Sequence, residues 1–170
     1  GGGSGADFLY GDSGDDILVG ASGDDTLDGG DDEDLLYGGD GIDHLNGGNQ
    51  NDRLVGGTGA DIIHGDAGDD LIYIANGDFT TNERIYGGAG TDTVILSNAT
   101  TVDFTIGTLE TVETLTGSDG NDNVTLGITQ FFNLTDIDYG TGTNVQTILV
   151  SGTHDVTALT APTVANVSAS

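Results

Sequence analysis

Aliphatic residues recur at a fixed interval of nine positions along the first part of the chain. They are Leu9, Leu18, Leu27, Leu36, Leu45, Leu54, Ile63 and Ile72. The residues between them are mainly glycine and aspartate, and they repeat with the same period. A period of nine matches neither the 3.6 residues of a helix nor the two of a half-buried strand. Repeats of this kind indicate a solenoid, in which each repeat forms one short unit and neighbouring units share a core.

Written in nines from Gly2, the sequence gives eight contiguous repeats that end at Tyr73. The first position is glycine in all eight, the sixth is aspartate and the eighth is aliphatic. The segment IANGDFTTNERIY at 74–86 is an insertion, which is followed by a ninth repeat at 87–95 and a weaker one at 117–125. We therefore divide the chain into a repeat block with an insertion, residues 1–95, and a β-rich extension or cap, residues 96–170.

Each repeat predicts a turn of about six residues followed by a short strand of about three. Glycines at the first, second and fourth positions permit the positive φ angles that reverse a chain tightly. Because side chains alternate across a strand, the eighth position points inward and the seventh and ninth point outward. Two repeats complete one coil, and coils stacked about 4.8 Å apart form two parallel sheets around a thin core. The expected fold is all-β: a parallel β-roll, or right-handed β-solenoid, continued or capped by Thr/Val-rich strands.

The charge of the chain narrows the class of its partners. The formal net charge is −27, and Arg53 and Arg84 are the only Lys or Arg residues. Nucleic acids and anionic membranes are bound through clusters of Lys and Arg, so we exclude both as partners. No apolar run approaches the roughly 20 residues of a membrane span, so we expect no membrane insertion. Stacked turns place aspartate over aspartate, which is strongly repulsive without counterions, and we therefore expect bound cations.

Calcium suits a column of carboxylates better than the other common metals do. It accepts six to eight oxygen ligands in flexible geometry, whereas magnesium needs a tighter octahedron and keeps its waters. The chain has no cysteine and no cluster of histidines beside the aspartates, which argues against zinc and copper. His44 and His64 fall at diagonal outward positions, where the alternatives are a transition-metal site and two solvated histidines.

The pattern G-G-x-G-x-D-x-U-x resembles the calcium-binding nonapeptide of the hemolysin-type, repeats-in-toxin (RTX) family. The resemblance covers about half the chain. It implies a β-roll with calcium held between repeats n and n+2, and export from a Gram-negative bacterium by a type I system. Eight contiguous repeats contain six such pairs, so we expect about six well-formed Ca²⁺ sites. The expected ligands are turn carbonyls and the sixth-position aspartates, which are Asp7, Asp16, Asp25, Asp34, Asp43, Asp52, Asp61, Asp70, Asp92 and Asp122.

Two features depart from the regular pattern. Asp32 and Gln50 stand at the fourth position, and Asp12, Ala21 and Asp66 at the second, where the family prefers glycine. The outward positions of the even repeats are nearly all apolar, interrupted by a single arginine. Large apolar surfaces usually mark contacts, so this face is covered either by the C-terminal segment of the chain or by a partner subunit or neighbouring domain.

No feature of the sequence indicates an enzyme. A catalytic pair of carboxylates needs two different environments, whereas these aspartates recur identically. G-x-S-x-G, H-E-x-x-H and phosphate-binding glycine loops are absent from the sequence. We expect a module folded by extracellular calcium that is a structural or assembly part of a secreted or cell-surface protein, such as an S-layer, fibril or adhesin. Its partners are calcium ions, with self-assembly or neighbouring domains of the same protein. The alternative is the folding and export appendage of a secreted enzyme or toxin.

Overall fold

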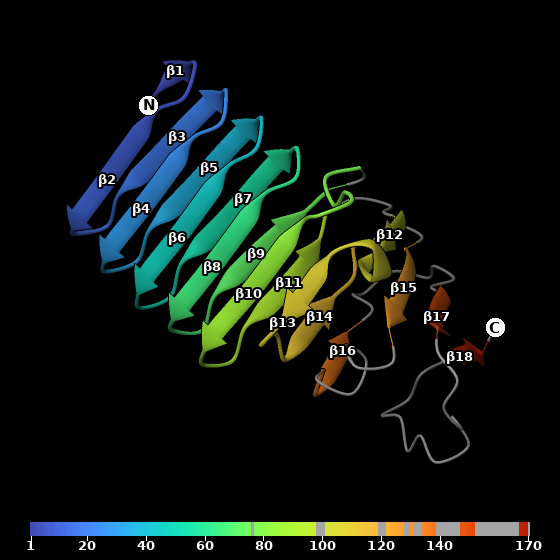
Figure 1. Ribbon diagram of the computed structural model, residues 1–170. Helices are drawn as coiled ribbons and strands as arrows, with labels where there is room; N and C mark the ends of the chain where they lie inside the picture. The colour runs from blue at the N-terminus through green and yellow to red at the C-terminus, as the bar shows by residue number, and fades with distance from the viewer. Residues whose placement is uncertain are drawn as a thin grey trace.

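The computed structural model describes residues 1–75, 77–97, 101–118, 122–127, 130, 134–138, 147–151 and 167–169. Within these residues the strands form three sheets, and every pair of neighbouring strands is parallel. Figure 1 shows the coils stacked in a row that leads from the N-terminus at one end to the C-terminal strands at the other. The predicted parallel β-solenoid is confirmed.

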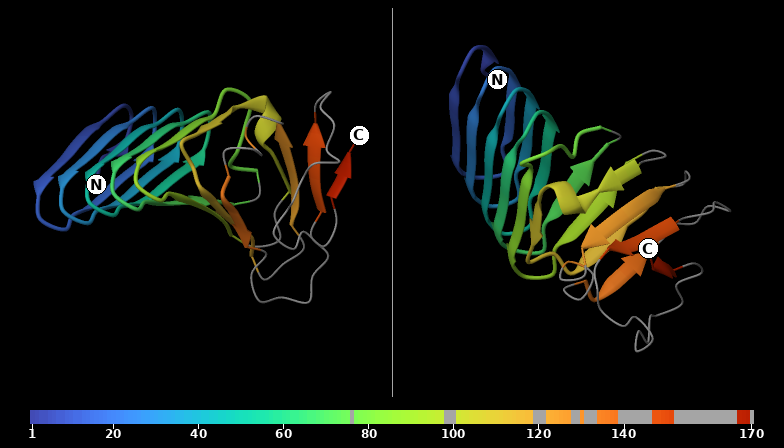
Figure 2. Two further views of the ribbon diagram at one scale, coloured as in Figure 1. Left: turned by 90° about the horizontal axis from the view of Figure 1, so that it is seen from below. Right: turned by 45° about the vertical axis from the view of Figure 1, so that its right-hand side comes forward.

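Two sheets form the walls of the roll. The first sheet contains, in spatial order, β1 (Gly3–Ser4), β3 (Ile17–Ser22), β5 (Leu35–Asp40), β7 (Arg53–Thr58), β9 (Leu71–Ile74), β11 (Thr93–Leu96), β14 (Thr114–Thr116) and β16 (Asp136–Asp138). The second contains β2 (Phe8–Ser13), β4 (Thr26–Asp31), β6 (His44–Asn49), β8 (Ile62–Ala67), β10 (Arg84–Ala89) and β13 (Thr108–Glu110). Consecutive strands of the repeat block alternate between the two sheets, so that two repeats make one coil (Figure 2).

A third sheet lies at the C-terminal end of the stack. It contains β12 (Thr101–Asp103), β15 (Asn123–Gly127), β17 (Thr147–Ser151) and β18 (Val167–Ala169). A short 3₁₀ turn, η1 (Phe104–Ile106), follows β12, and its buried Phe104 packs edge-to-face against Phe79 at 4.8 Å between ring centroids. The division of the chain at residue 95 stays a prediction, although β14 and β16 extend the first sheet beyond that point.

The eighth position of each repeat builds the core, as the alternation of side chains predicts. Leu36 lies in register with Leu18 and Leu54 in the first sheet, and Leu45 with Leu27 and Ile63 in the second. These side chains are between 0% and 8% exposed. Beyond the regular repeats the same place is taken by Ile85, Val94, Leu109 and Leu115, which are also buried.

The strands are longer than the three residues that the sequence predicts. β4 covers six residues, and its pairing with β6 continues past the aliphatic position into the glycines, where Gly30 lies opposite Gly48. Identical turns stacked in register can hydrogen-bond to one another as strands do, which extends the ladder into the turn. The residues at non-glycine turn positions adopt the expected left-handed conformation, with φ of 83° at Asp32 and 71° at Gln50.

The insertion at 74–86 supplies a half-coil of the roll. Its last residues enter β10, where Ile85 lies opposite Ile63 in the register of the regular repeats. The thirteen residues therefore equal one nine-residue repeat with four extra residues in its turn. Because the added length stays in the turn, the stacking of the core is uninterrupted.

The outward apolar side chains of the first sheet are exposed in its first strands and half-buried further along, at Leu35, Val55, Leu71 and Tyr73. Ile17 is 68% exposed, Tyr37 40% and Val19 37%. The described C-terminal strands continue the stack from its end (Figures 1 and 2), whereas these side chains lie on its flank. Among the described residues, no helix is long and apolar enough to cross a membrane.

Candidate metal centre

The sixth-position aspartates lie at the turns that precede the strands, and they form two ladders along the edges of the roll. The first ladder precedes strands of the first sheet and consists of Asp16, Asp34, Asp52, Asp70 and Asp92. The second ladder precedes strands of the second sheet and consists of Asp7, Asp25, Asp43 and Asp61. Seven of these nine side chains are at most 1% exposed, whereas Asp7 and Asp16 in the first coil are half-buried. Each carboxylate therefore stands above another that is one coil away.

From the second coil onward, one oxygen of each ladder carboxylate accepts a hydrogen bond from the backbone of the preceding coil. The backbone N–H of Asp34 donates to Oδ1 of Asp52 at 2.8 Å, and the N–H of Asp52 donates to Oδ1 of Asp70 at 2.8 Å. The same bond recurs along both ladders, with N···O distances of 2.8–2.9 Å between aspartates. The carbonyl of Asp34 in turn accepts from the N–H of Arg53 at 2.9 Å. These bonds fix the height and orientation of the ladder carboxylates beyond the first coil.

The other oxygen has no partner. The Oδ2 atoms of Asp7, Asp25, Asp34, Asp43, Asp52, Asp61, Asp70 and Asp92 are buried and accept no hydrogen bond within the described residues. Leaving a buried polar atom unsatisfied costs about 1–3 kcal/mol, and more for a charged group. Native proteins rarely carry several such atoms without an ion or water to satisfy them. Eight of them, repeated in register, indicate a recurrent ligand that the carboxylates share.

The first-position glycine of each repeat clears the space that these oxygens face. A Cβ atom at Gly47 would lie 2.5 Å from Oδ2 of Asp52 and 2.8 Å from the carbonyl oxygen of Gly65 in the next coil. The expectation that this glycine is needed for a positive φ is wrong, because the left-handed angles occur at the second and fourth positions. The first-position glycine is needed because a side chain would displace the two oxygens. Carboxylate and carbonyl thus converge beside such a glycine.

Burial makes the charged form of the ladder costly without a cation. It raises the pKa of Asp52 from 3.8 to about 7, and the pKa values of Asp61 and Asp92 to about 6. A backbone N–H from the preceding coil partly offsets the rise in each pKa, while neighbouring carboxylates add to it. For Asp52 these carboxylates are Asp70, Asp34 and Glu33. Burial also raises the pKa values of Asp34, Asp43 and Asp70. A bound cation would favour the charged form of all these groups.

Two glutamates extend the ladders, and sequence reasoning missed both. Oε2 of Glu83 accepts from the N–H of Asp61 at 3.1 Å, and Oε2 of Glu113 accepts from the N–H of Asp92 at 2.9 Å. Burial raises the pKa of Glu83 to about 8, with the charge of Asp61 as a second cause. Their separations of 22 and 21 residues from the preceding aspartates break the period of eighteen. A usable signal exists in the acidic residue two places before a core aliphatic, as in Glu83-Arg84-Ile85.

Asp122 does not join either ladder. It precedes β15 in the third sheet, and its carboxylate accepts from the N–H of Ser118, four residues earlier in the chain, at 2.9 Å. It is 2% exposed. Its assignment as a metal ligand stays a prediction that the geometry of the ladders does not support.

The two histidines expected on the second sheet lie on neighbouring strands. His44 is opposite Ile62, and His64 stacks on Tyr86 with the ring centroids 4.7 Å apart and the planes inclined by 16°. Within the described residues, no three His, Cys, Asp or Glu side chains form a group that could hold a metal by themselves. An ion in a ladder would therefore combine two carboxylates with turn carbonyls, and the histidines are not brought to a transition-metal site.

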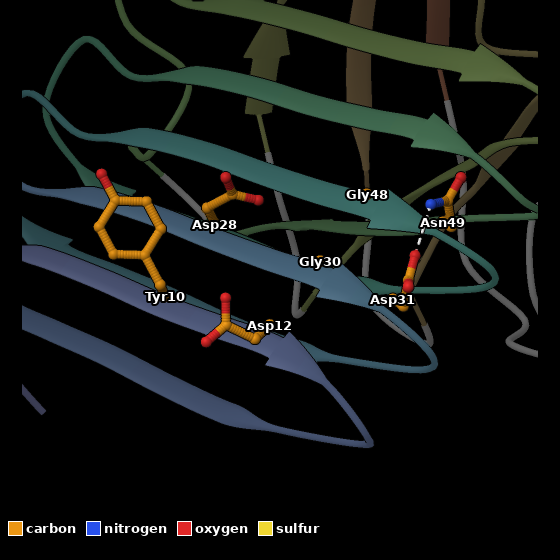
Figure 3. Close-up of a pocket in the computed structure, with 7 residues that line it drawn as sticks. All are labelled: Tyr10, Asp12, Asp28, Gly30, Asp31, Gly48 and Asn49. Carbon is orange, nitrogen blue, oxygen red and sulfur yellow. Dashed lines mark hydrogen bonds between the residues drawn. The ribbon is translucent and has the colours of Figure 1, made fainter.

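An open groove on the outer face of β2, β4 and β6 lies apart from the ladders (Figure 3). It is lined by Tyr10, Asp12, Asp28, Gly30, Asp31, Gly48 and Asn49. The side-chain amide of Asn49 donates to Oδ1 of Asp31 at 2.7 Å, one of several bonds between equivalent residues of successive turns. Tyr10 and the carboxylates of Asp12 and Asp31 are exposed, unlike those of the ladders.

The donor set of the ladders fits calcium. All convergent atoms are carboxylate or carbonyl oxygens, which a hard cation prefers, and there is no thiolate or imidazole among them. The residues that would hold the ions are the paired ladder carboxylates together with carbonyls of the glycine-rich turns. When bound, calcium would coordinate the buried Oδ2 atoms and neutralise the negative charge of the carboxylates.

Comparison with known proteins agrees with this chemistry. A family model described as "RTX calcium-binding nonapeptide repeat (4 copies)" matches residues 1–36, 10–45, 46–78, 80–98 and 110–128. These matches cover well over half of the chain and include both ladders. No curated protein and no solved structure matches the chain.

Proposed function

The chain belongs to the RTX calcium-binding nonapeptide-repeat family, and from this premise we propose that it is a calcium-folded structural module of a secreted or cell-surface protein of a Gram-negative bacterium. The repeats form a structural calcium-binding fold. In the proposed function the module has no catalytic role of its own. It supplies instead a rigid, extended body whose formation depends on calcium outside the cell.

One observation carries the proposal: paired ladder carboxylates with buried, unpartnered oxygens. Nine pairs of successive ladder residues are joined by a bond from a backbone N–H to a carboxylate. Six of these pairs lie within the eight contiguous repeats, which is the number of sites that the sequence predicts. We assign one calcium ion to each regular pair.

Calcium binding and folding are one process in this proposal. The two carboxylates of a regular pair are eighteen residues apart, so no site exists before the coils have stacked. An ion that binds the folded chain and not the unfolded one stabilises it by about 2.7 kcal/mol per site at 100 times its Kd. In a cytosol with little calcium the chain stays unfolded and competent for export, and millimolar calcium outside the cell folds it.

The exposed apolar side chains favour a structural or assembly role over a simple appendage. On the first sheet Ile17 is 68% exposed, and the exposed Val19 lies opposite the exposed Tyr37 on the next strand. On the second sheet Phe8 and Tyr10 of β2 are 71% and 63% exposed. Side chains of this size at the surface usually mark contacts with another protein surface when they gather in a patch. We therefore propose that the roll contacts other copies of itself or neighbouring domains of the same protein.

A calcium titration followed by circular dichroism and light scattering tests this function. Strand signal should appear cooperatively with calcium, should be lost with chelator and should not return with magnesium at the same concentration. Growth of the scattering mass after folding supports assembly, whereas a stable folded monomer favours the appendage of a secreted enzyme or toxin. A chain with the same strand signal in chelator and in calcium would contradict the proposal altogether.

A further inference from the structure

The first ladder continues beyond the ninth repeat, residues 87–95. We propose that Asp92 and Glu113 form a further calcium site at its C-terminal end, in a turn that has no nonapeptide sequence. This inference rests on the proposed function, because it assigns the same ion to a pair in which Asp92 belongs to the ninth repeat and Glu113 lies outside the nine-residue pattern.

The register of the regular ladder is preserved at this pair. The N–H of Asp92 donates to Oε2 of Glu113 at 2.9 Å, as the N–H of Asp70 donates to Oδ1 of Asp92 at 2.9 Å. The carbonyl of Asp92 accepts from the N–H of Thr114 at 2.9 Å, as the carbonyl of Asp70 accepts from the N–H of Thr93 at 2.9 Å. Glu113 therefore occupies the place of a sixth-position aspartate in the next coil.

The unpartnered oxygen is also present. Asp92 is 0% exposed, and its Oδ2 is buried and accepts no hydrogen bond from the described residues. It faces the space beside Gly87, and the carbonyl oxygen of Thr111 from the next coil faces the same space, so that a Cβ atom at Gly87 would clash with both. The regular sites that begin at Asp25, Asp34, Asp43 and Asp52 have this same combination of a buried Oδ2 and a carbonyl from the next coil.

The turn that precedes Glu113 is shorter than a regular turn. In a regular repeat the aspartate stands five positions after the first-position glycine, whereas Glu113 stands only two positions after Thr111. The longer side chain of glutamate restores the reach to the N–H of Asp92. The ladder ends at this point, since the next strand, β16, is preceded by Thr135, whose N–H donates to the carbonyl of Glu113 at 2.7 Å.

The second ladder ends differently. At Gly56, a Cβ atom would meet Oδ2 and Cγ of Asp61 and Cδ1 of Ile63, and the three nearest atoms include no carbonyl from the next coil. Any carbonyl from the next coil therefore lies no closer than 3.1 Å to this position, whereas the carbonyl of Gly65 lies 2.8 Å from the corresponding position at Gly47. We therefore assign the additional site to Asp92 and Glu113 and not to Asp61 and Glu83.

Native mass spectrometry of the full chain at saturating calcium tests the site. Glu113→Gln keeps an acceptor for the N–H of Asp92 but removes the charge, and it should bind one calcium ion fewer than the unaltered chain. Glu110→Gln is the matched control, because Glu110 is exposed and its substitution makes the same change in net charge three residues away. An unchanged number of ions in Glu113→Gln would overturn the site. If the unaltered chain binds no calcium, the proposed function itself fails.

Carboxyl footprinting of the unaltered chain is a second test of the site, and it does not require the Glu113→Gln variant to fold. In calcium, carbodiimide coupling should modify Glu110 readily and Glu113 several-fold more slowly, although Glu113 is only half-buried. Equal rates at the two glutamates in the folded, calcium-loaded chain would overturn the assignment.

Discussion

Replacing Asp52 by asparagine separates the two roles of a ladder carboxylate. The asparagine keeps an Oδ1 acceptor for the N–H of Asp34, and its own N–H still donates to Asp70, so the hydrogen-bonded ladder is preserved. The change removes the negative charge and replaces the unpartnered Oδ2 by an amide nitrogen. The variant should therefore have opposite effects on stability in the absence and presence of calcium.

The size of each effect follows from the structure. Burial raises the pKa of Asp52 from 3.8 to about 7, which corresponds to about 4 kcal/mol at 1.36 kcal/mol per tenfold change in acidity. Solvent screening at the edge of the roll reduces this unfavourable free energy to about 2 kcal/mol. Asp52→Asn should therefore stabilise the calcium-free fold by about 2 kcal/mol above pH 8. In calcium the variant weakens the two sites that share Asp52, each worth about 2.7 kcal/mol at 100 times its Kd, so it should lose about 3–5 kcal/mol.

Circular dichroism measures both effects. In chelator, the concentration of trimethylamine oxide that half-folds the chain should be lower for Asp52→Asn than for the unaltered chain. In excess calcium, the urea midpoint of the variant should be lower. Asp12→Asn is the control, because it removes the same charge from an exposed side chain outside the ladders. A change of the same sign in both conditions would refute the interpretation of the ladder as a charge column balanced by calcium.

Three further predictions concern the glycines, the pH and the core. Gly47→Ala should abolish the adjacent calcium sites, because the new Cβ would lie 2.5 Å from Oδ2 of Asp52. Gly14→Ala is the control: its Cβ meets nothing within 4 Å, and it should lower the free energy of unfolding by only about 1 kcal/mol because of the φ of 102° at this position. Titration calorimetry with calcium compares the two variants. Without calcium, the fold should become more stable as the pH falls from 8 to 5, because the raised pKa values mean that the folded chain binds more protons than the unfolded one. Stability that falls with falling pH, followed by circular dichroism, would be inconsistent with the buried carboxylates. In calcium, Leu45→Ala should lower the free energy of unfolding by about 2–4 kcal/mol, since Leu45 is 1% exposed. Val19→Ala, at an exposed position, should lower it by less than about 1 kcal/mol. Urea unfolding measures both variants.

The nine-residue period is sufficient to predict the roll and its ladders because two repeats make one coil, so equivalent residues of successive coils are eighteen positions apart. A residue at the eighth position, such as Leu36, meets its counterparts eighteen residues away, and one inward side chain per strand determines which face is buried. The sixth-position aspartates follow from the same arithmetic. Their pairing in n and n+2 therefore follows from the sequence alone.

The ends of the ladders could not be predicted from the period. Glu83 and Glu113 occupy ladder positions after turns that are four residues longer or three shorter than the regular turn. Stacked coils keep the same spacing even when they contain different numbers of residues. A ladder position can therefore be occupied by a residue that does not follow the nine-residue period. The weak repeat at 117–125 shows the converse, because Asp122 keeps the sequence pattern but precedes a strand of the third sheet.

The role of the first-position glycine was also beyond the sequence. Glycine is required at a position either because φ is positive or because a side chain would collide with something, and composition does not distinguish the two. At Gly47 the second cause applies, and it connects the most regular feature of the sequence directly to the candidate ligand oxygens.

Anomalous diffraction from crystals of the full chain grown in calcium tests the central claim most directly. We expect a row of calcium peaks along each edge of the roll, one between successive ladder aspartates, with each ion about 2.3–2.6 Å from the Oδ2 of a ladder aspartate. Ordered ladders without such peaks, or calcium found only at exposed carboxylates such as Asp12 and Asp31, would contradict the assignment of the ladders as calcium sites.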